Sequence, residues 1–202
     1  MKVAEIFRSI QGEGRRQGYP CIFLRLAGCN LACSWCDTPH ARTGGTEMTR
    51  GEIARRIGEI PGRYTCITGG EPLLQGEQLL PLIRFLHDRG YTIDIETNGT
   101  VDFRQFQPCA SVCMDVKCPS SGAASDHSLL CHISEEDAVK FVVADRKDCD
   151  YAASVLQDYP VRGEIFFSPV FGTDYHQIAD FLLAGDLPIR LQFQLHKVIG
   201  VR

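Results

Sequence analysis

The sequence predicts an α/β fold in a single domain, residues 1–202. Short apolar segments with strand character alternate with segments of helical periodicity, which is typical of α/β proteins. No internal repeat, low-complexity stretch or charged tail divides the chain, whose length suffices for one sizeable core. Polar residues also recur at period two near the ends of several strands. This last pattern suggests a sheet that curves around a ligand site.

Eight segments are expected to form strands, because they are short, apolar and bounded by turn residues. They are Val3–Phe7, Cys21–Leu26, Tyr64–Thr68, Thr92–Thr97, Ser111–Val116, Ala138–Val143, Glu164–Ser168 and Arg190–Gln194. The clearest helix begins at Thr49, where Thr49-x-x-Glu52 is a capping box, and continues to about Ile60. Three more helices are expected over Gly76–Arg89, Cys149–Gln157 and Tyr175–Ala184.

The polar residues on these strands allow two interpretations. They are Arg25, Asp94, Glu96, Asp115, Lys117, Arg190, Gln192, Gln194 and His196. A parallel sheet covered by helices is usually apolar on both faces, so the repetition predicts a barrel interior with a ligand site at the carboxyl ends of the strands. The alternative is that these residues belong to edge strands and face water.

Composition argues against several classes of protein. The formal net charge of −4 argues against a nucleic-acid-binding surface. No apolar run approaches the length of a membrane span, and the first residues, MKVAE, do not begin a signal peptide. The 10 cysteines occur in a chain with long regular elements, unlike a short secreted disulfide protein. We therefore expect a reducing, cytoplasmic location.

The most informative motif is C-x3-C-x2-C, formed by Cys29, Cys33 and Cys36 directly after an expected strand. Thiolates at such short spacings usually hold zinc or an iron–sulfur cluster. A structural zinc ion needs four protein ligands, whereas a four-iron cluster held by three cysteines keeps one iron open for a small molecule. The spacing is the signature of radical S-adenosylmethionine (SAM) enzymes. The alternative is three buried cysteines adjacent by chance.

The other cysteines carry a weaker signal. Cys109, Cys113 and Cys118 form C-x3-C-x4-C, which could hold an auxiliary cluster. Cys113 obeys the alternation of its strand, however, so packing is the preferred interpretation. Cys21 and Cys66 lie in apolar runs and are expected to pack as small hydrophobic residues.

A second motif, Thr68-Gly69-Gly70-Glu71-Pro72, follows an expected strand directly. The two glycines allow close approach to the backbone, and the glutamate supplies a charged acceptor. This combination suits the ammonium group of SAM, and its place one βα unit after the cysteines matches radical SAM proteins. Glu96-Thr97-Asn98-Gly99 ends the next strand and is compatible with both a turn and a ligand role.

Further segments make the resemblance more specific. IFRSIQGEG (residues 6–14), FLRLAGCNL (23–31) and WCDT (35–38), with His196-Lys197, closely resemble the 7-carboxy-7-deazaguanine synthases, a family of radical SAM enzymes. The resemblance extends from Glu5 to Lys197. It implies a partial, trimmed (β/α) barrel, usually a homodimer. The implied reaction converts 6-carboxy-5,6,7,8-tetrahydropterin to 7-carboxy-7-deazaguanine with loss of ammonia, on the route to 7-deazapurines such as queuosine.

The resemblance also implies site residues. Cys29, Cys33 and Cys36 would hold a [4Fe–4S] cluster, Thr38 would bind Mg2+ through its hydroxyl, and Arg25 would clamp the substrate carboxylate. Further substrate contacts are implied for Ile10, Gln11 and Gly12 through backbone groups, and for Thr68 and Arg202. SAM contacts are implied for Trp35, Cys36, Asp37, Gly70, Asp115, Val116, Lys117, Ser168, Pro169, Val170 and Phe171. Asp37 and Thr38 have a simpler interpretation as residues of a turn before Pro39.

The implied cofactors are the [4Fe–4S] cluster, SAM and Mg2+, and the implied partners are the pterin, an external electron donor of flavodoxin or ferredoxin type, and a second copy of the chain. Neither nucleic acid nor a membrane is expected as a partner. Two other functions stay open. A glycyl-radical-enzyme activase shares the cysteine spacing. A non-enzymatic iron–sulfur or zinc module would leave Arg25, the Gly69-Gly70-Glu71 segment and the polar strand ends unexplained.

Overall fold

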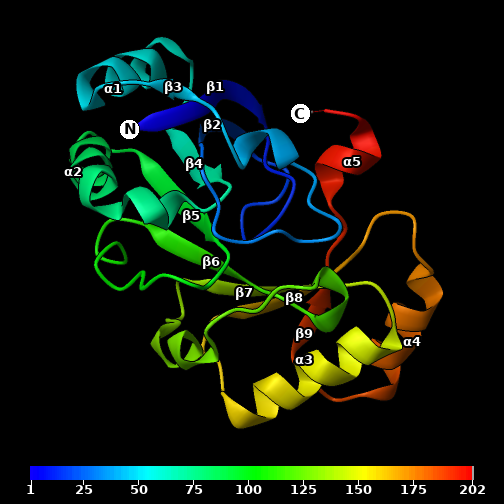
Figure 1. The fold of residues 1–202 in the computed structure, drawn as a ribbon. Coiled ribbons are helices and arrows are strands. Elements are labelled where there is room, and N and C mark those ends of the chain that lie inside the picture. The colour runs from blue at the N-terminus through cyan, green and yellow to red at the C-terminus, as the bar shows by residue number, and fades with distance from the viewer. Residues whose placement is uncertain (202) are drawn as a thin grey trace.

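The computed structural model describes residues 1–201, in which nine strands form one sheet in the order β3-β1-β2-β4-β5-β6-β7-β8-β9 (Figure 1). The strands are β1 (Lys2–Ile10), β2 (Pro20–Leu26), β3 (Thr46–Glu47), β4 (Tyr64–Gly69), β5 (Thr92–Thr97), β6 (Ser111–Val116), β7 (Ala138–Val143), β8 (Glu164–Pro169) and β9 (Ile189–Leu191). Neighbours from β2 to β9 are parallel, whereas β1 is antiparallel to β2 and β3.

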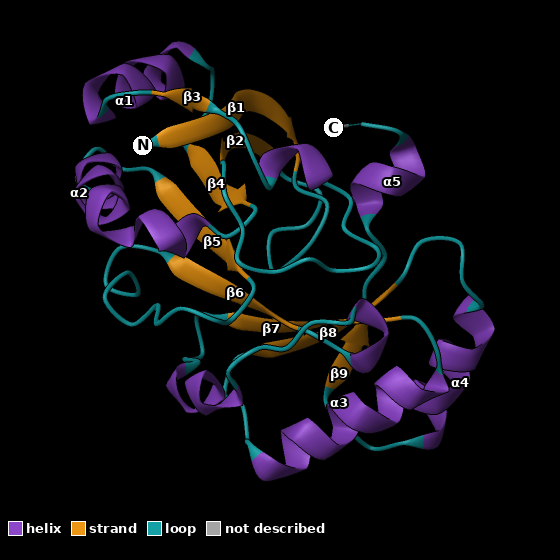
Figure 2. Ribbon diagram, viewed as in Figure 1, coloured by secondary structure: helices purple, strands orange, loops and turns teal. Residues whose placement is uncertain are grey.

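The helices lie around the sheet, with α1 and α2 on one flank and α3 and α4 on another (Figure 2). They are α1 (Arg50–Glu59), α2 (Gly76–His87), α3 (Arg146–Asp158), α4 (Tyr175–Ala184) and the short α5 (Leu195–Ile199). The β5–β6 and β6–β7 connections contain no α-helix, and no ladder within residues 1–201 joins β3 to β9. A complete (β/α) barrel has a helix after each strand and a closed sheet. The fold is therefore the expected trimmed barrel.

Most expected elements are present. The bounds of β5, β6, β7 and α4 are those predicted, and the Thr49–Glu52 capping box is formed. Helix α3 begins at Arg146, earlier than expected, because the Asp145 side chain caps it by accepting from the Asp148 N–H. The last expected strand is shorter, since β9 ends at Leu191. Strand β3 and helix α5 were not predicted.

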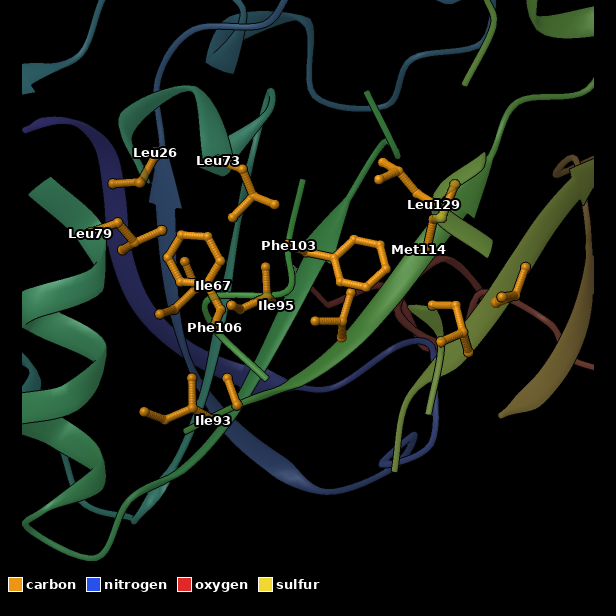
Figure 3. Packing of buried hydrophobic residues seen from close by; sticks show 14 of the residues in the cluster. Leu26, Ile67, Leu73, Leu79, Ile93, Ile95, Phe103, Phe106, Met114 and Leu129 are labelled. Carbon is orange, nitrogen blue, oxygen red and sulfur yellow. The ribbon is translucent and has the colours of Figure 1, made fainter. Parts of the chain in front are cut away.

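The hydrophobic core lies between the outer face of the sheet and the helices. Leu26, Ile67, Ile95 and Met114, on four successive parallel strands, are fully buried in it (Figure 3). Side chains alternate between the two faces of a strand, so the neighbours of these residues face inward. Those inward residues include Arg25, Thr68, Glu96 and Asp115, which line one cavity. The barrel-interior interpretation is confirmed for Arg25, Glu96 and Asp115.

Arg190 is an exception to that interpretation. Its side chain is exposed, pairs with Glu164 and does not line the cavity. Within residues 1–201, none of the helices combines the length and hydrophobicity that crossing a bilayer requires.

The loop of residues 11–18, between β1 and β2, connects the N-terminal hairpin to the segment that follows β9. The Gly14 N–H donates to Gln192 Oε1 at 2.7 Å, and Gln192 Nε2 donates to the Gly14 carbonyl at 2.9 Å. Because a side-chain amide carries both a donor and an acceptor group, as a peptide group does, Gln192 acts as a substitute strand partner. The Leu195 N–H also donates to the Gly12 carbonyl at 3.0 Å. These bonds bridge the open side of the sheet.

Candidate active site

A cavity of about 440 Å³ lies on the inner side of the sheet at the carboxyl ends of the parallel strands. This volume is typical of small-molecule sites. Most of the site residues expected from the sequence line it: Ile10, Gln11, Gly12, Arg25, Cys29, Cys33, Trp35, Cys36, Asp37, Thr38, Thr68, Gly70, Asp115, Lys117, Val170 and Phe171.

The cysteine segment forms one wall of this cavity as an irregular loop held by hydrogen bonds. The Ser34 N–H donates to the Ser121 carbonyl at 2.9 Å, and Trp35 Nε1 donates to Ser120 Oγ at 3.2 Å. The thiols of Cys29, Cys33 and Cys36 are free and partly exposed. The loop therefore presents all three thiols to the cavity.

The three thiols fit an iron–sulfur cluster better than a zinc ion. In residues 1–201, no three Cys, His, Asp or Glu side chains surround a point that one metal ion could occupy. Cluster thiolates bind different irons, so they stand further apart than the ligands of one ion. Burial raises the pKa of the Cys33 thiol, and the charge of Lys117 opposes this rise. Lys117 thus favours the thiolate that binds iron.

Gly69, the last residue of β4, and Gly70 after it let the cysteine loop lie against the strand end. A Cβ atom on Gly70 would stand 2.3 Å from the Gly28 carbonyl oxygen and 2.6 Å from Cys29 Cβ. A Cβ on Gly69 would stand 2.3 Å from the Leu26 carbonyl oxygen. Both positions therefore require glycine for steric reasons.

Glu71 has a different role from the one expected. Its carboxylate is completely buried and accepts hydrogen bonds from the Leu73 N–H at 3.0 Å, the Thr97 hydroxyl at 3.0 Å and the Asn98 N–H at 2.6 Å. It does not line the cavity. Glu71 therefore fixes the β5 end and its turn, and the expected contact with an ammonium group is not supported by this geometry.

The second group of cysteines is placed for packing. Cys113 packs with Ala138 and Phe166, whereas Cys118 belongs to the main core with Cys109 packed against it. Cys113 and Cys118 thus lie in different hydrophobic clusters. This placement supports the packing interpretation of these residues.

Arg25 is oriented by an acidic neighbour. Its Nε donates to Glu5 Oε1 at 2.8 Å, and His40 Nε2 lies 3.3 Å from the same oxygen. Arg25 makes no other side-chain hydrogen bond within the described residues. The two terminal nitrogens of the guanidinium therefore keep their donors for a ligand in the cavity.

Glu96 connects two of the expected substrate residues. Gln11 Nε2 donates to Glu96 Oε1 at 3.3 Å, and the Thr68 hydroxyl donates to Glu96 Oε2 at 3.0 Å. The backbone of Gln11 is partly used, because its N–H donates to Tyr19 and its carbonyl accepts from Gly18, both at 2.8 Å. The Gln11 N–H is therefore occupied, and its carbonyl oxygen keeps one lone pair for the backbone contact expected.

Thr38 precedes a 3-10 turn, Pro39–Ala41, and its carbonyl accepts from the Ala41 N–H at 2.9 Å. Its hydroxyl makes no capping bond although the residue lines the cavity. Asp37 Oδ2 lies 3.3 Å from Lys197 Nζ and 3.8 Å from His196 Nε2. Burial acts to raise the pKa of Asp37, but His196 and Lys197 hold it well below its usual range. Asp37 is therefore an anion that ties the cysteine loop to α5.

Comparisons with known proteins agree with this geometry. Residues 24–115 match the model of the Radical SAM superfamily. A protein of Methanospirillum hungatei JF-1 named 7-carboxy-7-deazaguanine synthase is 52% identical over 201 residues, which cover 100% of this chain and 86% of the relative. The chain belongs to the 7-carboxy-7-deazaguanine synthase family. A relative of the same name from Thermoplasma acidophilum is 36% identical, with 98% of this chain and 97% of the relative covered.

Two solved structures share the fold of this chain. The crystal structure of QueE from Escherichia coli superimposes with a TM-score of 0.80 at 26% identity, covering 96% of this chain and 94% of that chain. SuiB of Streptococcus suis shares the fold alone, with a TM-score of 0.64 at 10% identity. The superposition covers 88% of this chain and 50% of the SuiB chain. As a radical SAM enzyme, this 7-carboxy-7-deazaguanine synthase family member uses a [4Fe–4S] cluster and SAM.

Three described site residues expected for this synthase family member do not line the cavity. Val116 is buried in the core, and Ser168 and Pro169 are buried at the end of β8. The Ser168 hydroxyl is buried without a partner in the described residues. Arg202 lies outside the described residues.

Glu5, Arg42, Lys140 and Glu13 are charged residues of the cavity that were not predicted as site residues. Lys140 lies in β7 and Glu13 in the 11–18 loop, and Lys140 Nζ is 2.6 Å from Glu13 Oε2. One signal was available for Lys140: it interrupts the apolar run AVKFVV at a position that faces the same side as Ala138 and Val142. No comparable signal marks Glu13, whose role depends on where its loop folds.

Proposed function

We propose that this protein is a radical SAM lyase that converts 6-carboxy-5,6,7,8-tetrahydropterin to 7-carboxy-7-deazaguanine with loss of ammonia, in the biosynthesis of queuosine precursors. The observation that carries the proposal is one cavity, lined both by the three thiols of the cysteine loop and by Arg25. The cavity thereby combines the thiolates of a radical-generating cluster with a cation that suits a carboxylated substrate. The 52% identity to a named 7-carboxy-7-deazaguanine synthase supports the same conclusion.

The substrate is held at both ends. The terminal N–H groups of Arg25 receive its carboxylate, which a planar guanidinium binds in a bidentate manner. The ring N–H and amino groups of a pterin are donors, and the Glu96 carboxylate beside Gln11 and Thr68 is an acceptor in the same cavity. These two anchors orient the ring between them.

The cofactor residues occupy the wall formed by the cysteine loop and the ends of β4, β6 and β8. When bound, the cluster supplies the electron that cleaves SAM reductively, and this cleavage starts radical chemistry on the substrate. Gly70 permits the close approach of SAM, and Asp115 and Lys117 offer charges to its polar groups. Asp115 Oδ1 is buried without a hydrogen-bond partner in the described residues, as expected for a ligand acceptor. Trp35, Cys36, Asp37, Val170 and Phe171 complete this wall.

Thr38 is the proposed protein ligand of Mg2+. Thr38 lines the cavity, and its hydroxyl does not cap the following turn. A neutral hydroxyl is a weak ligand, so the ion would bind well only when the substrate carboxylate and water complete its shell.

The remaining features of the proposal concern the whole protein. Residues 1–202 act as one radical SAM core domain that forms a homodimer in the cytoplasm. An external flavodoxin- or ferredoxin-type protein supplies the electrons. Size-exclusion chromatography with light scattering tests the dimer, and reduction by purified flavodoxin tests the donor.

The direct test is anaerobic reconstitution of the cluster, followed by incubation with SAM, reductant, Mg2+ and the carboxypterin. Formation of 7-carboxy-7-deazaguanine and ammonia in equal amounts is the expected result. SAM cleavage without pterin turnover would overturn the proposal and favour a glycyl-radical-enzyme activase. Absence of SAM cleavage as well would favour a non-enzymatic iron–sulfur module.

A further inference from the structure

Lys140 is a buried ammonium group on the inner face of the sheet. Its side chain is only 7% exposed, and the other five residues of β7 are buried. An unpaired ammonium in such a place would cost much folding free energy, so the role of Lys140 depends on the anions that pair with it.

The two partners of Lys140 come from different parts of the site. Lys140 Nζ lies 2.6 Å from Glu13 Oε2 and 3.5 Å from Asp115 Oδ2. Glu13 belongs to the 11–18 loop, which begins with the proposed substrate residues. Asp115 lies near the end of β6, on the proposed SAM wall. Lys140 is therefore a cation shared between the two subsites.

Each carboxylate also has a second partner on its own side. Asp115 Oδ2 lies 3.0 Å from Lys117 Nζ, and Glu13 Oε1 accepts from Gln194 Nε2 at 3.2 Å. Gln194 Oε1 in turn accepts from Lys197 Nζ at 2.6 Å. Positive and negative side chains therefore alternate from Lys117 to Glu13. The neutral Gln194 then connects Glu13 to Lys197, in the segment after β9.

We propose that Lys140 is a positioning residue that couples the SAM and pterin subsites, so that each ligand strengthens the binding of the other. The inference rests on the proposed function, because it takes the pterin as the second ligand. A SAM hydroxyl that donates to Asp115 Oδ1 draws negative charge away from the oxygen that Lys140 shares. The ammonium then interacts more strongly with Glu13, and the 11–18 loop is held in the conformation that forms the pterin pocket.

Calorimetric titration of the reconstituted protein without reductant tests the inference, since no turnover occurs. The Kd of SAM is measured with and without saturating carboxypterin. We expect the pterin to tighten SAM binding about fivefold or more in the natural sequence, at the lower end of usual coupling strengths. In Lys140→Met/Glu13→Gln, which removes the ion pair without leaving Glu13 charged, the ratio should fall below about twofold.

A matched control removes an exposed ion pair of the same charge, Arg55→Met/Glu59→Gln on α1. It should keep the coupling of the natural sequence. Should the Lys140→Met/Glu13→Gln protein fail to fold, the reduced coupling must appear in the single variant Glu13→Gln, which keeps Lys140 paired with Asp115.

The outcomes distinguish the proposed function from the proposed role of Lys140. A natural protein that binds SAM but no carboxypterin contradicts the proposed function, and the coupling with it. A natural protein that binds both ligands independently, or folded variants that retain its full coupling, overturns the role of Lys140 alone.

Discussion

Arg25 and Glu5 are direct partners in the β1–β2 ladder, and their side chains form an ion pair with Nε and Oε1 2.8 Å apart. Both side chains are largely buried, at 14% and 16% exposure. The register of the hairpin thus fixes the plane of the guanidinium. The orientation of the proposed carboxylate clamp is consequently set by backbone pairing.

Arg25→Lys should lower pterin turnover by more than about tenfold, because an ammonium cannot bind Glu5 and a carboxylate with the same fork geometry. Slow SAM cleavage without substrate should persist. Both activities are measured by chromatography of the products. Arg63→Lys, a change outside the cavity, serves as the control. An equal loss of both activities would show that Arg25 supports the fold or the cluster instead.

Gly70→Ala should reduce the iron retained after reconstitution, since the new Cβ would press on the Gly28 backbone and on Cys29. Overpacking of this kind costs about 1–3 kcal/mol. Gly51→Ala in α1 is the matched control, because no atom outside its chain neighbours and the backbone of its own helix lies within 4 Å of the added Cβ. Iron content and melting temperature are the measurements. Normal iron content in Gly70→Ala would show that the loop can move without harm.

Replacing Cys29, Cys33 or Cys36 by Ala should abolish the visible absorbance of the four-iron cluster, because two thiolates rarely retain one. Replacing Cys109, Cys113 or Cys118 by Ala should leave iron content near that of the natural sequence. Some loss of melting temperature is expected for the fully buried Cys118. Loss of iron in any of these last three variants would reveal a second cluster.

Glu71 should make stability depend on pH. Burial raises its pKa, although hydrogen bonds from Asn98, Leu73 and Thr97 oppose the rise. A carboxyl with a raised pKa in the folded state stabilises the fold fully below its unfolded pKa of about 4.3, and this contribution is lost as the pH rises through the folded pKa. The melting-temperature difference between the natural sequence and Glu71→Gln should therefore shrink from pH 4 upward. The exposed change Glu77→Gln should show no such trend, and a difference that grows with pH would contradict the assignment.

Removal of Mg2+ by a chelator should slow turnover or weaken the apparent affinity for the pterin, while the cluster spectrum stays unchanged. Thr38→Ala should respond less to added Mg2+, and Thr38→Ser should respond almost normally because the oxygen remains. Steady-state kinetics over a range of Mg2+ concentrations measure this dependence. A normal response in Thr38→Ala would leave Thr38 as a turn residue only.

Much of the fold could be predicted because its signals are local. The capping box at Thr49 and the apolar runs between turn residues determine elements from a few neighbouring positions. Strand β3 and helix α5 have only 2 and 5 residues, too few for a periodic signal. The end of β9 depends on a bond between Gln192 and Gly14, which are 178 residues apart, and no local pattern reveals it.

The same distinction holds for the site. The cysteine spacing and the polar strand ends located the cavity, since both are short-range patterns. The partners of the charged groups were not predictable, because pairs such as Lys140–Glu13 join segments 127 residues apart. For Glu71, the motif was recognised from the sequence but the direction of the side chain was not. Hydrogen bonds from Thr97 and Asn98 turn the Glu71 carboxylate away from the cavity.

The bond between Gln192 and Gly14 also has a consequence for biosynthesis. At about 5–20 residues per second, the 178 residues between them take roughly 9–36 s to translate. During that interval the cysteine loop has left the ribosome, but the segment that closes the open side of the sheet has not been made. Cys29, Cys33 and Cys36 are therefore present on the nascent chain before Gln194 and His196, which line the finished cavity, have been made.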